Sequence, residues 1–285
     1  MGSRNSVRRE PRFPPYLLLL FPAVTFMLLM YAYPFVSSFT RSMLDADGNW
    51  TFANYAKTWE LYLKDIVFTF GVTVFSTAVT GVLAILMAVY LRFRQSRISA
   101  ILSGLYKLPI FIPFVVVAQM MNSFLAPHGL FNVALAQLGL VDINQPLQLF
   151  NFSGLSFGFI WKMVPFSVLI IHGGFQMIDN SYIEAARSAG ARRLKVIVRI
   201  LIPMSKSSIM VALVLVYSQI VGTFTLPYML IGGKSPTTIT VDIAHRVNYF
   251  RDFGVANTLG VFSYFLVLFT ALYYLRSNVK KMAST

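Results

Sequence analysis

Long apolar runs are the feature that most constrains how this chain folds. A helix that crosses a bilayer needs roughly 20 predominantly apolar residues. Six runs meet that requirement, at about residues 17–36, 66–91, 101–125, 155–177, 209–231 and 255–275. The third and fourth are the least regular, because each contains a lysine (Lys107, Lys162) and proline. The sequence therefore predicts an all-α membrane protein with six spans.

Composition supports this class and excludes others. Of 285 residues, 56% are hydrophobic and only 12% are charged, about half the charged fraction of soluble domains. The net charge of +14 does not indicate a nucleic-acid partner, because the basic residues lie between apolar runs and form no water-exposed domain. Since the chain has no cysteine, disulfides, thiol catalysis and thiolate metal sites are excluded.

The basic residues predict the orientation, because Lys and Arg concentrate in cytoplasmic segments. Alternate connections are rich in them, whereas segment 126–151 has none. Both termini and the connection between the fourth and fifth runs are expected in the cytoplasm. The basic residues that set this bias include Arg4, Arg8, Arg9, Arg12, Arg92, Arg94, Arg97, Arg276, Lys280 and Lys281.

The order of these segments predicts one membrane domain. Residues 1–16 are expected to form a cytoplasmic tail, 17–275 the six-helix domain, and 276–285 a second cytoplasmic tail. A cleaved signal peptide is the alternative for the N-terminus, but the first run is long and no clear cleavage site follows it. The connections are too short for an independent core.

The connection at residues 178–204 is polar and contains a helix break. Ser181 and Glu184 have capping-box spacing, which predicts a helix start at Ser181. Small residues follow, and Gly190 has the residue type expected just beyond a helix end. In a second helix, one apolar face is expected to hold Leu194, Ile197, Val198 and Leu201.

Two interpretations of this loop follow from the residues alone. A basic amphipathic helix typically lies on the membrane surface, and Pro203 is expected to end this one before the fifth span. A short helix with small residues and a glycine break instead favours insertion into a groove of another protein.

The loop resembles the EAA motif of ABC-importer permeases, E-A-A-x3-G-x9-I-x-L-P. Every position matches except the leucine, which is Ile202. The six runs and the place of the loop resemble the same family, most of all its polyamine, iron and thiamine permeases, then its sugar permeases. The subgroup is suggested by segments 129–139 and 226–233.

The resemblance implies a type I importer permease fold in a bacterial inner membrane. The expected partners are a cytoplasmic ABC ATPase dimer, a second permease subunit (identical or different), an extracytoplasmic solute-binding protein and membrane lipid. ATP would be bound by the ATPase, and the permease itself would need no cofactor. The residues implied to couple to the ATPase are Glu184, Ala185, Ala186, Gly190, Ile200 and Pro203. Glu184 also has the alternative role of helix capping.

Polar residues within the runs are candidates for a solute path, because such residues usually face a cavity or a partner helix. The candidates are Lys162, Trp161, Asn122, Gln119, Tyr217 and Gln219. Lys107 and His172 are weaker candidates, since they could extend to the interface or bond between helices. The predicted spans contain no Asp or Glu, which favours a neutral or anionic solute over a polyamine.

Other functions lack support in the sequence. Segment 232–235 (GGKS) resembles the end of a phosphate-binding loop, but the first glycine of that motif would fall at Tyr228. The histidines have no metal-site spacing, and no catalytic constellation is present, so the chain is not expected to be an enzyme. The alternatives are an ion-gradient-driven secondary transporter, which would need embedded acids and inverted repeats, or a channel subunit.

Overall fold

Helices make up almost all of the structure, a computed structural model that describes residues 16–94 and 96–282. The α-helices are α1 (Tyr16–Met27), α2 (Tyr33–Ser42), α3 (Ala53–Phe93), α4 (Arg97–Leu105), α5 (Phe114–Leu125), α6 (Leu130–Gln137), α7 (Phe152–Gln176), α8 (Asn180–Ser188), α9 (Arg193–Val196), α10 (Ile202–Met204), α11 (Lys206–Gly222), α12 (Thr225–Leu230), α13 (Ile239–His245) and α14 (Phe253–Met282). The π-helical turns are η1 (Leu28–Ala32), η3 (Ile197–Leu201) and η4 (Arg246–Phe250), and η2 (Leu108–Phe111) is a 3₁₀ turn. The all-α class is confirmed.

Within the described ranges, five helical segments are long and apolar enough to cross a membrane. They are Leu19–Ser42, Ala53–Phe93, Phe114–Gln137, Phe152–Gln176 and Phe253–Leu272. Counting the bent pair Arg193–Met204 and Lys206–Gly222 as one span gives six, the predicted number. The basic residues Arg4 to Arg12 of the predicted tail lie outside the described residues.

Several predicted boundaries were wrong. The second span begins at Ala53 and not near residue 66. The third is no continuous helix, because the chain breaks between α4 and α5 at Pro109 and Pro113, and proline cannot donate a helical hydrogen bond. The fifth run breaks after Gly222, and α12 is a separate short helix. Helix α14 extends to Met282, so residues 276–282 of the predicted C-terminal tail are helical, and the assignment of this segment as a cytoplasmic tail stays a prediction.

The core lies between α3, α7 and α11. Small side chains let these helices approach, as is usual where helices pack in a membrane. Ala84 and Ala88 of α3 are fully buried. A Cβ at Gly81 would stand 2.6 Å from Leu213 Cδ2 of α11, so glycine permits that approach.

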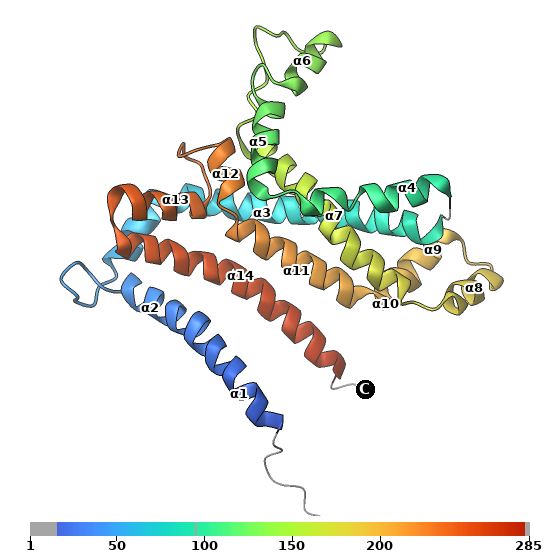
Figure 1. Ribbon diagram of the computed structural model, residues 1–285, viewed down its shortest axis with the longest axis horizontal. Helices are drawn as coiled ribbons and strands as arrows, with labels where there is room; N and C mark the ends of the chain where they lie inside the picture. Colours follow the sequence, from blue (N-terminus) through green and yellow to red (C-terminus); the bar gives the residue numbers. More distant parts are fainter. Residues whose placement is uncertain (1–15, 95, 283–285) are drawn as a thin grey trace, which may run out of the picture.

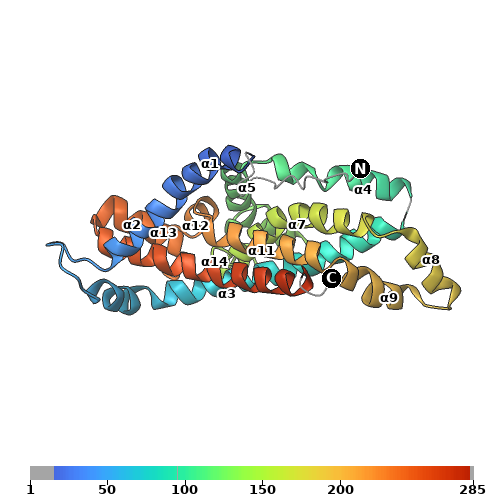
Figure 2. The same ribbon diagram turned by 90° about the horizontal axis from the view of Figure 1, so that it is seen from below.

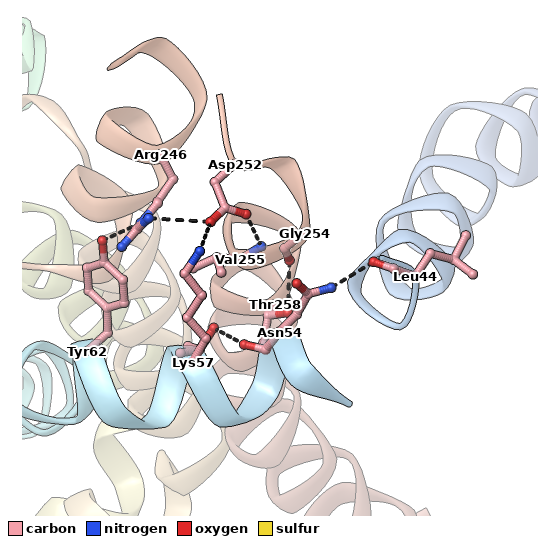
Figure 3. Close-up of polar contacts among 10 residues, drawn as sticks. Leu44, Asn54, Lys57, Tyr62, Arg246, Asp252, Gly254, Val255 and Thr258 are labelled. Carbon is pink, nitrogen blue, oxygen red and sulfur yellow. Dashed lines mark hydrogen bonds and ion pairs between the residues drawn. The ribbon is translucent and has the colours of Figure 1, made fainter. Parts of the chain in front are cut away.

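Helices α8 and α13 lie at opposite ends of the longest axis (Figures 1 and 2). We call these the α8 end and the α13 end. At the α13 end, Asp252 accepts hydrogen bonds from Lys57 Nζ at 2.6 Å and Arg246 Nη1 at 3.4 Å (Figure 3). Arg246 Nε also donates to the Tyr62 hydroxyl. These contacts join the first turns of α3 to η4 and the start of α14.

The two halves of the first span differ in how they pack within the described chain. Helix α2 contacts α14, but none of the most apolar part of Leu19–Ser42 is buried. Large side chains such as Phe21 and Phe26 remain exposed along α1. This face must therefore be covered by lipid or by another subunit in a membrane.

Candidate functional site

Helix α8 begins one residue earlier than predicted. Its cap is Asp179, whose Oδ1 accepts a hydrogen bond from Ser181 N at 2.8 Å. That bond lowers the pKa of Asp179 and satisfies one of the free N–H groups at the helix start. The predicted capping box of Ser181 and Glu184 was therefore wrong, and the exposed Glu184 side chain does not cap the helix.

The end of α8 is closed by Gly190, as predicted. Its φ is +79°, a left-handed conformation that glycine adopts without a Cβ penalty. Gly190 N donates to Arg187 O and Ala191 N to Ala186 O, both at 2.9 Å. This pair of bonds is the Schellman motif, so α8 is a short helix with both ends fixed.

Helix α8 presents small residues on its outer surface. Ile183 is buried and Ala186 is half-buried against the core. Glu184 and Ala185 are exposed, as are Ala189 and Gly190. The predicted loop residues Glu184, Ala185 and Gly190 thus share an exposed helix whose other face is anchored.

Two residues at the end of α3 hold α8 in place, and sequence reasoning did not identify them. Arg92 Nη2 donates to Ile178 O at 2.8 Å and to Asn180 Oδ1 at 2.6 Å. The Arg187 guanidinium lies 5.6 Å from the centroid of the Phe93 ring. The basic residues at the end of the second run, Arg92 among them, could have indicated a contact with the polar loop, but they predicted only the orientation of the chain.

The second half of the loop differs from the predicted amphipathic helix. Leu194 and Val198 are exposed, while Val196 and Leu201 are buried. The π-helical turn η3 changes the register, so side chains do not follow the spacing of an ideal α-helix. Ile200 packs against the core. An exposed groove of about 520 Å³ runs along this half, lined by Gly190, Arg192, Leu194, Lys195, Val198 and Arg199.

Pro203 does not end the helix that precedes it. It occupies an early position of α10, where its missing N–H is tolerated. The break falls at Ser205, and the axes on either side meet at 70°. Ser205 is buried, so this bend is packed inside the molecule.

Lys162 is held by backbone carbonyl groups. Its Nζ donates to Pro109 O at 2.7 Å, Ile110 O at 3.3 Å and Ile112 O at 2.6 Å. Only 8% of the residue is exposed. The ammonium thereby bonds three carbonyl groups at the break between α4 and α5, of which Pro109 O also accepts a hydrogen bond from Ile112 N at 3.3 Å.

The other path candidates fall in different places. Gln119 and Trp161 line one cavity of about 490 Å³. Gln219 lines a second, of about 300 Å³, together with Lys162. Asn122 Nδ2 donates to Met229 O at 2.9 Å and so joins α5 to α12. Tyr217 is buried and lines a third cavity beside α14.

The prediction that the spans lack acidic residues was also wrong, because α3 starts earlier than expected. Asp65 lies in α3 and is 2% exposed. Its Oδ1 accepts hydrogen bonds from Thr237 N at 2.7 Å and Ser235 Oγ at 3.0 Å. This carboxylate holds the loop before α13.

Comparison with known proteins identifies the family. Residues 80–281 match the model of binding-protein-dependent transport system inner membrane components. The chain belongs to this family. It is thus a permease of the ABC-importer type, a multi-pass inner-membrane component and not an enzyme.

Two curated relatives are similar to parts of the permease. The sulfoquinovosyl glycerol transport system permease protein of Agrobacterium fabrum is 34% identical over 52% of this chain and 50% of its own length. The spermidine/putrescine transport system permease protein of Salmonella typhimurium is 26% identical over 65% of this chain and 64% of its own length. The matched part thus spans about half to two-thirds of these relatives.

A solved structure supports the fold of the permease. A chain of a bacterial ABC transporter involved in the import of the acidic polysaccharide alginate matches with a TM-score of 0.77 at 22% identity. The match covers 92% of this chain and 96% of the other. The type I permease fold predicted from the motif is confirmed.

Proposed function

We propose that this permease is the membrane subunit of an ATP-driven importer and that α8 inserts into a groove of a cytoplasmic ATPase. The short, doubly capped helix with an exposed small-residue surface carries this proposal. A partner groove can close around Ala185 and Gly190, because neither bears a large side chain. The assembly would contain two ATPases, a second permease subunit and an extracytoplasmic binding protein.

The contacts around α8 support a role in transmitting movement. Arg92 links the start of α8 to the end of α3, the longest helix, and α3 packs extensively on α7. On its other side, the loop continues through α10 to the packed bend at Ser205. A displacement of α8 would therefore reach α3 through the Arg92 contacts and α11 through the chain that connects them.

We further propose that the solute is a neutral or anionic polar compound of the sugar kind. In the described part of the chain, no carboxylate lines the cavities that contain Trp161 and Lys162. The buried acid Asp65 is already bonded within the protein. The sulfoquinovosyl glycerol relative supports this class, whereas the spermidine/putrescine relative is less similar in sequence.

ATP binding by this chain receives no support. The segment 232–235 lies before α13, at the opposite end from α8 (Figure 1). Segment 232–235, which resembles part of a phosphate-binding loop in sequence, therefore lies far from the proposed contact with the ATPase.

The coupling proposal is tested with Ala185→Trp. Ala185 is exposed, so this change should leave the fold intact while overfilling a partner groove, at a cost of ~1–3 kcal/mol or more. We expect loss of co-purification with the ATPase and of ATP-dependent uptake in proteoliposomes containing the full system. Leu140→Trp, at an exposed apolar position far along the chain from α8, is the control. Normal ATPase association of Ala185→Trp would refute the coupling proposal, and uptake driven by an ion gradient without ATP would favour a secondary transporter.

A further inference from the structure

A polar cavity lies between the ends of α3 and α7 and the short helix α4. Its volume is about 590 Å³, and it is separate from the α8 loop and from the cavities around Trp161 and Lys162. Its polar lining includes Arg94, Lys107, His172, Ser96, Ser99 and Ser103. Among the residues that the structure describes, no carboxylate belongs to this lining.

The orientation of α4 shows that the cavity is a built feature. The apolar side chains of Ile98, Ile101 and Leu105 point outward and are 63%, 60% and 54% exposed. The serines of the same helix line the cavity, and Ser99 is buried. A helix with its polar face inward and its apolar face outward suits a membrane, where it encloses a polar space beside the protein.

The cations in this cavity have no acidic partner. Among residues 16–94 and 96–282, the recorded ion pairs all involve Asp252 at the α13 end. Lys107 Nζ lies 5.7 Å from the centroid of its neighbour Tyr106, a contact that leaves its charge uncompensated. In the described part of the chain, His172 Nδ1 is buried and has no hydrogen-bond partner. The Ser103 hydroxyl donates to Ala100 O at 2.8 Å, so the hydroxyl donors of the site are those of Ser96 and Ser99. The site thus combines positive charge, two hydroxyl groups and an unsatisfied ring nitrogen.

We propose that this cavity binds a phosphate group, supplied either by the headgroup of an anionic phospholipid or by a small soluble phosphate. A guanidinium, an ammonium and serine hydroxyls are the donors that bind phosphate oxygens. Basic pockets between helices near the cytoplasmic surface are also typical lipid-headgroup sites. A bound phosphate would neutralise Arg94 and Lys107 and join α4 to α3 and α7.

Thermal unfolding of the full-length protein in neutral detergent tests this site, since a ligand that binds the native state raises its stability. The probes are short-chain phosphatidylglycerol and inorganic phosphate, titrated separately. We expect at least one of them to raise the unfolding temperature of the wild type. In the double variant Arg94→Gln/Lys107→Gln, the apparent dissociation constant of the stabilising probe should rise about tenfold or more, as expected when charged hydrogen bonds are lost.

Lys206→Gln is the matched control, because Lys206 is an exposed cation that lies outside this cavity. Lys107→Arg should retain binding, and it guards against a double variant that fails to fold. Stabilisation by phosphatidylglycerol alone identifies a lipid site, and equal stabilisation by phosphate identifies a site for soluble phosphate. The proposal is overturned if neither probe stabilises the wild type, or if Lys206→Gln weakens binding as much as the double substitution.

Discussion

At the scale of single residues, buried charges in this permease hold irregular backbone. Lys162 contacts three carbonyl groups at the break between α4 and α5. Asp65 contacts an N–H and a hydroxyl in the loop before α13. Each charge thus bonds backbone groups of a segment that is not a regular helix.

Replacement of Lys162 by methionine should destabilise the protein. The apolar side chain removes the donor from Ile110 O and Ile112 O, whereas Pro109 O keeps its bond from Ile112 N. Each buried carbonyl group left unsatisfied costs ~1–3 kcal/mol. Urea or thermal unfolding in detergent measures the loss. Lys206→Met removes an exposed cation and should change stability little. Unchanged stability of Lys162→Met with altered solute preference would instead place Lys162 in the solute path.

Asp242 should make stability depend on pH. Burial, together with the nearby charge of Asp65, raises the pKa of Asp242 from 3.8 to about 8, although Arg246 acts in the opposite direction. The folded state therefore binds this proton more tightly than the unfolded state. The resulting stabilisation is complete below about pH 4 and is lost as the pH rises through about 8.

Asp242→Asn should remove this dependence and should be more stable than the wild type above about pH 8, by an amount on the order of a few kcal/mol. Unfolding free energies measured from acidic to alkaline pH test the difference. Asp142→Asn, at an exposed loop position, should follow the wild-type curve. Parallel curves for wild type and Asp242→Asn would contradict the prediction.

At the scale of elements, the breaks between helices matter as much as the helices. The α8 loop combines a Schellman end, a π-helical turn and a 70° bend within residues 186–206. The sequence predicted the break at Gly190, because glycine adopts the left-handed conformation more readily than other residues. It could not predict the buried bend at Ser205, which depends on the packing of other helices around it.

Gly190→Ala and Gly104→Ala should differ because of backbone conformation alone. An added Cβ has open space at both positions, but only Gly190 has a positive φ. We expect Gly190→Ala to cost ~1–2 kcal/mol locally and to reduce ATPase stimulation, whereas Gly104→Ala, within α4, should be neutral or slightly stabilising. ATPase activity of the reconstituted complex and its thermal stability measure both effects. Equal behaviour of the two variants would show that the left-handed end of α8 is dispensable.

At the scale of the whole molecule, much of the architecture could be predicted and its internal contacts could not. Apolar runs set the number of spans, since bilayer thickness fixes the required length. Segment 101–125 was still assigned wrongly, because composition does not show that Lys162, about 50 residues away, stabilises a break there. The motif located the α8 loop, but only the fold shows that Arg92 of α3 bonds the start of α8.

The orientation of the whole molecule in the membrane stays a prediction. A reporter fused beyond α14 should be cytoplasmic, because the two termini and the alternate connections between spans are rich in Lys and Arg. A reporter inserted near residue 140, between α6 and α7, should lie outside. Protease accessibility of each reporter in intact cells and in inverted vesicles shows on which side of the membrane it lies. The reverse pattern would place α8 on the wrong side for a cytoplasmic ATPase.

The bend at Ser205 sets the direction in which a force acts. Because the two axes meet at 70°, a push along α9 and α10 reaches α11 mainly from the side. Sliding α11 along its own axis would draw its apolar length out of the hydrocarbon layer, whereas tilting keeps that length inside, and bilayers accommodate tilt at modest cost. Under the proposed coupling, the joint would convert a thrust parallel to one helix into the rotation of another.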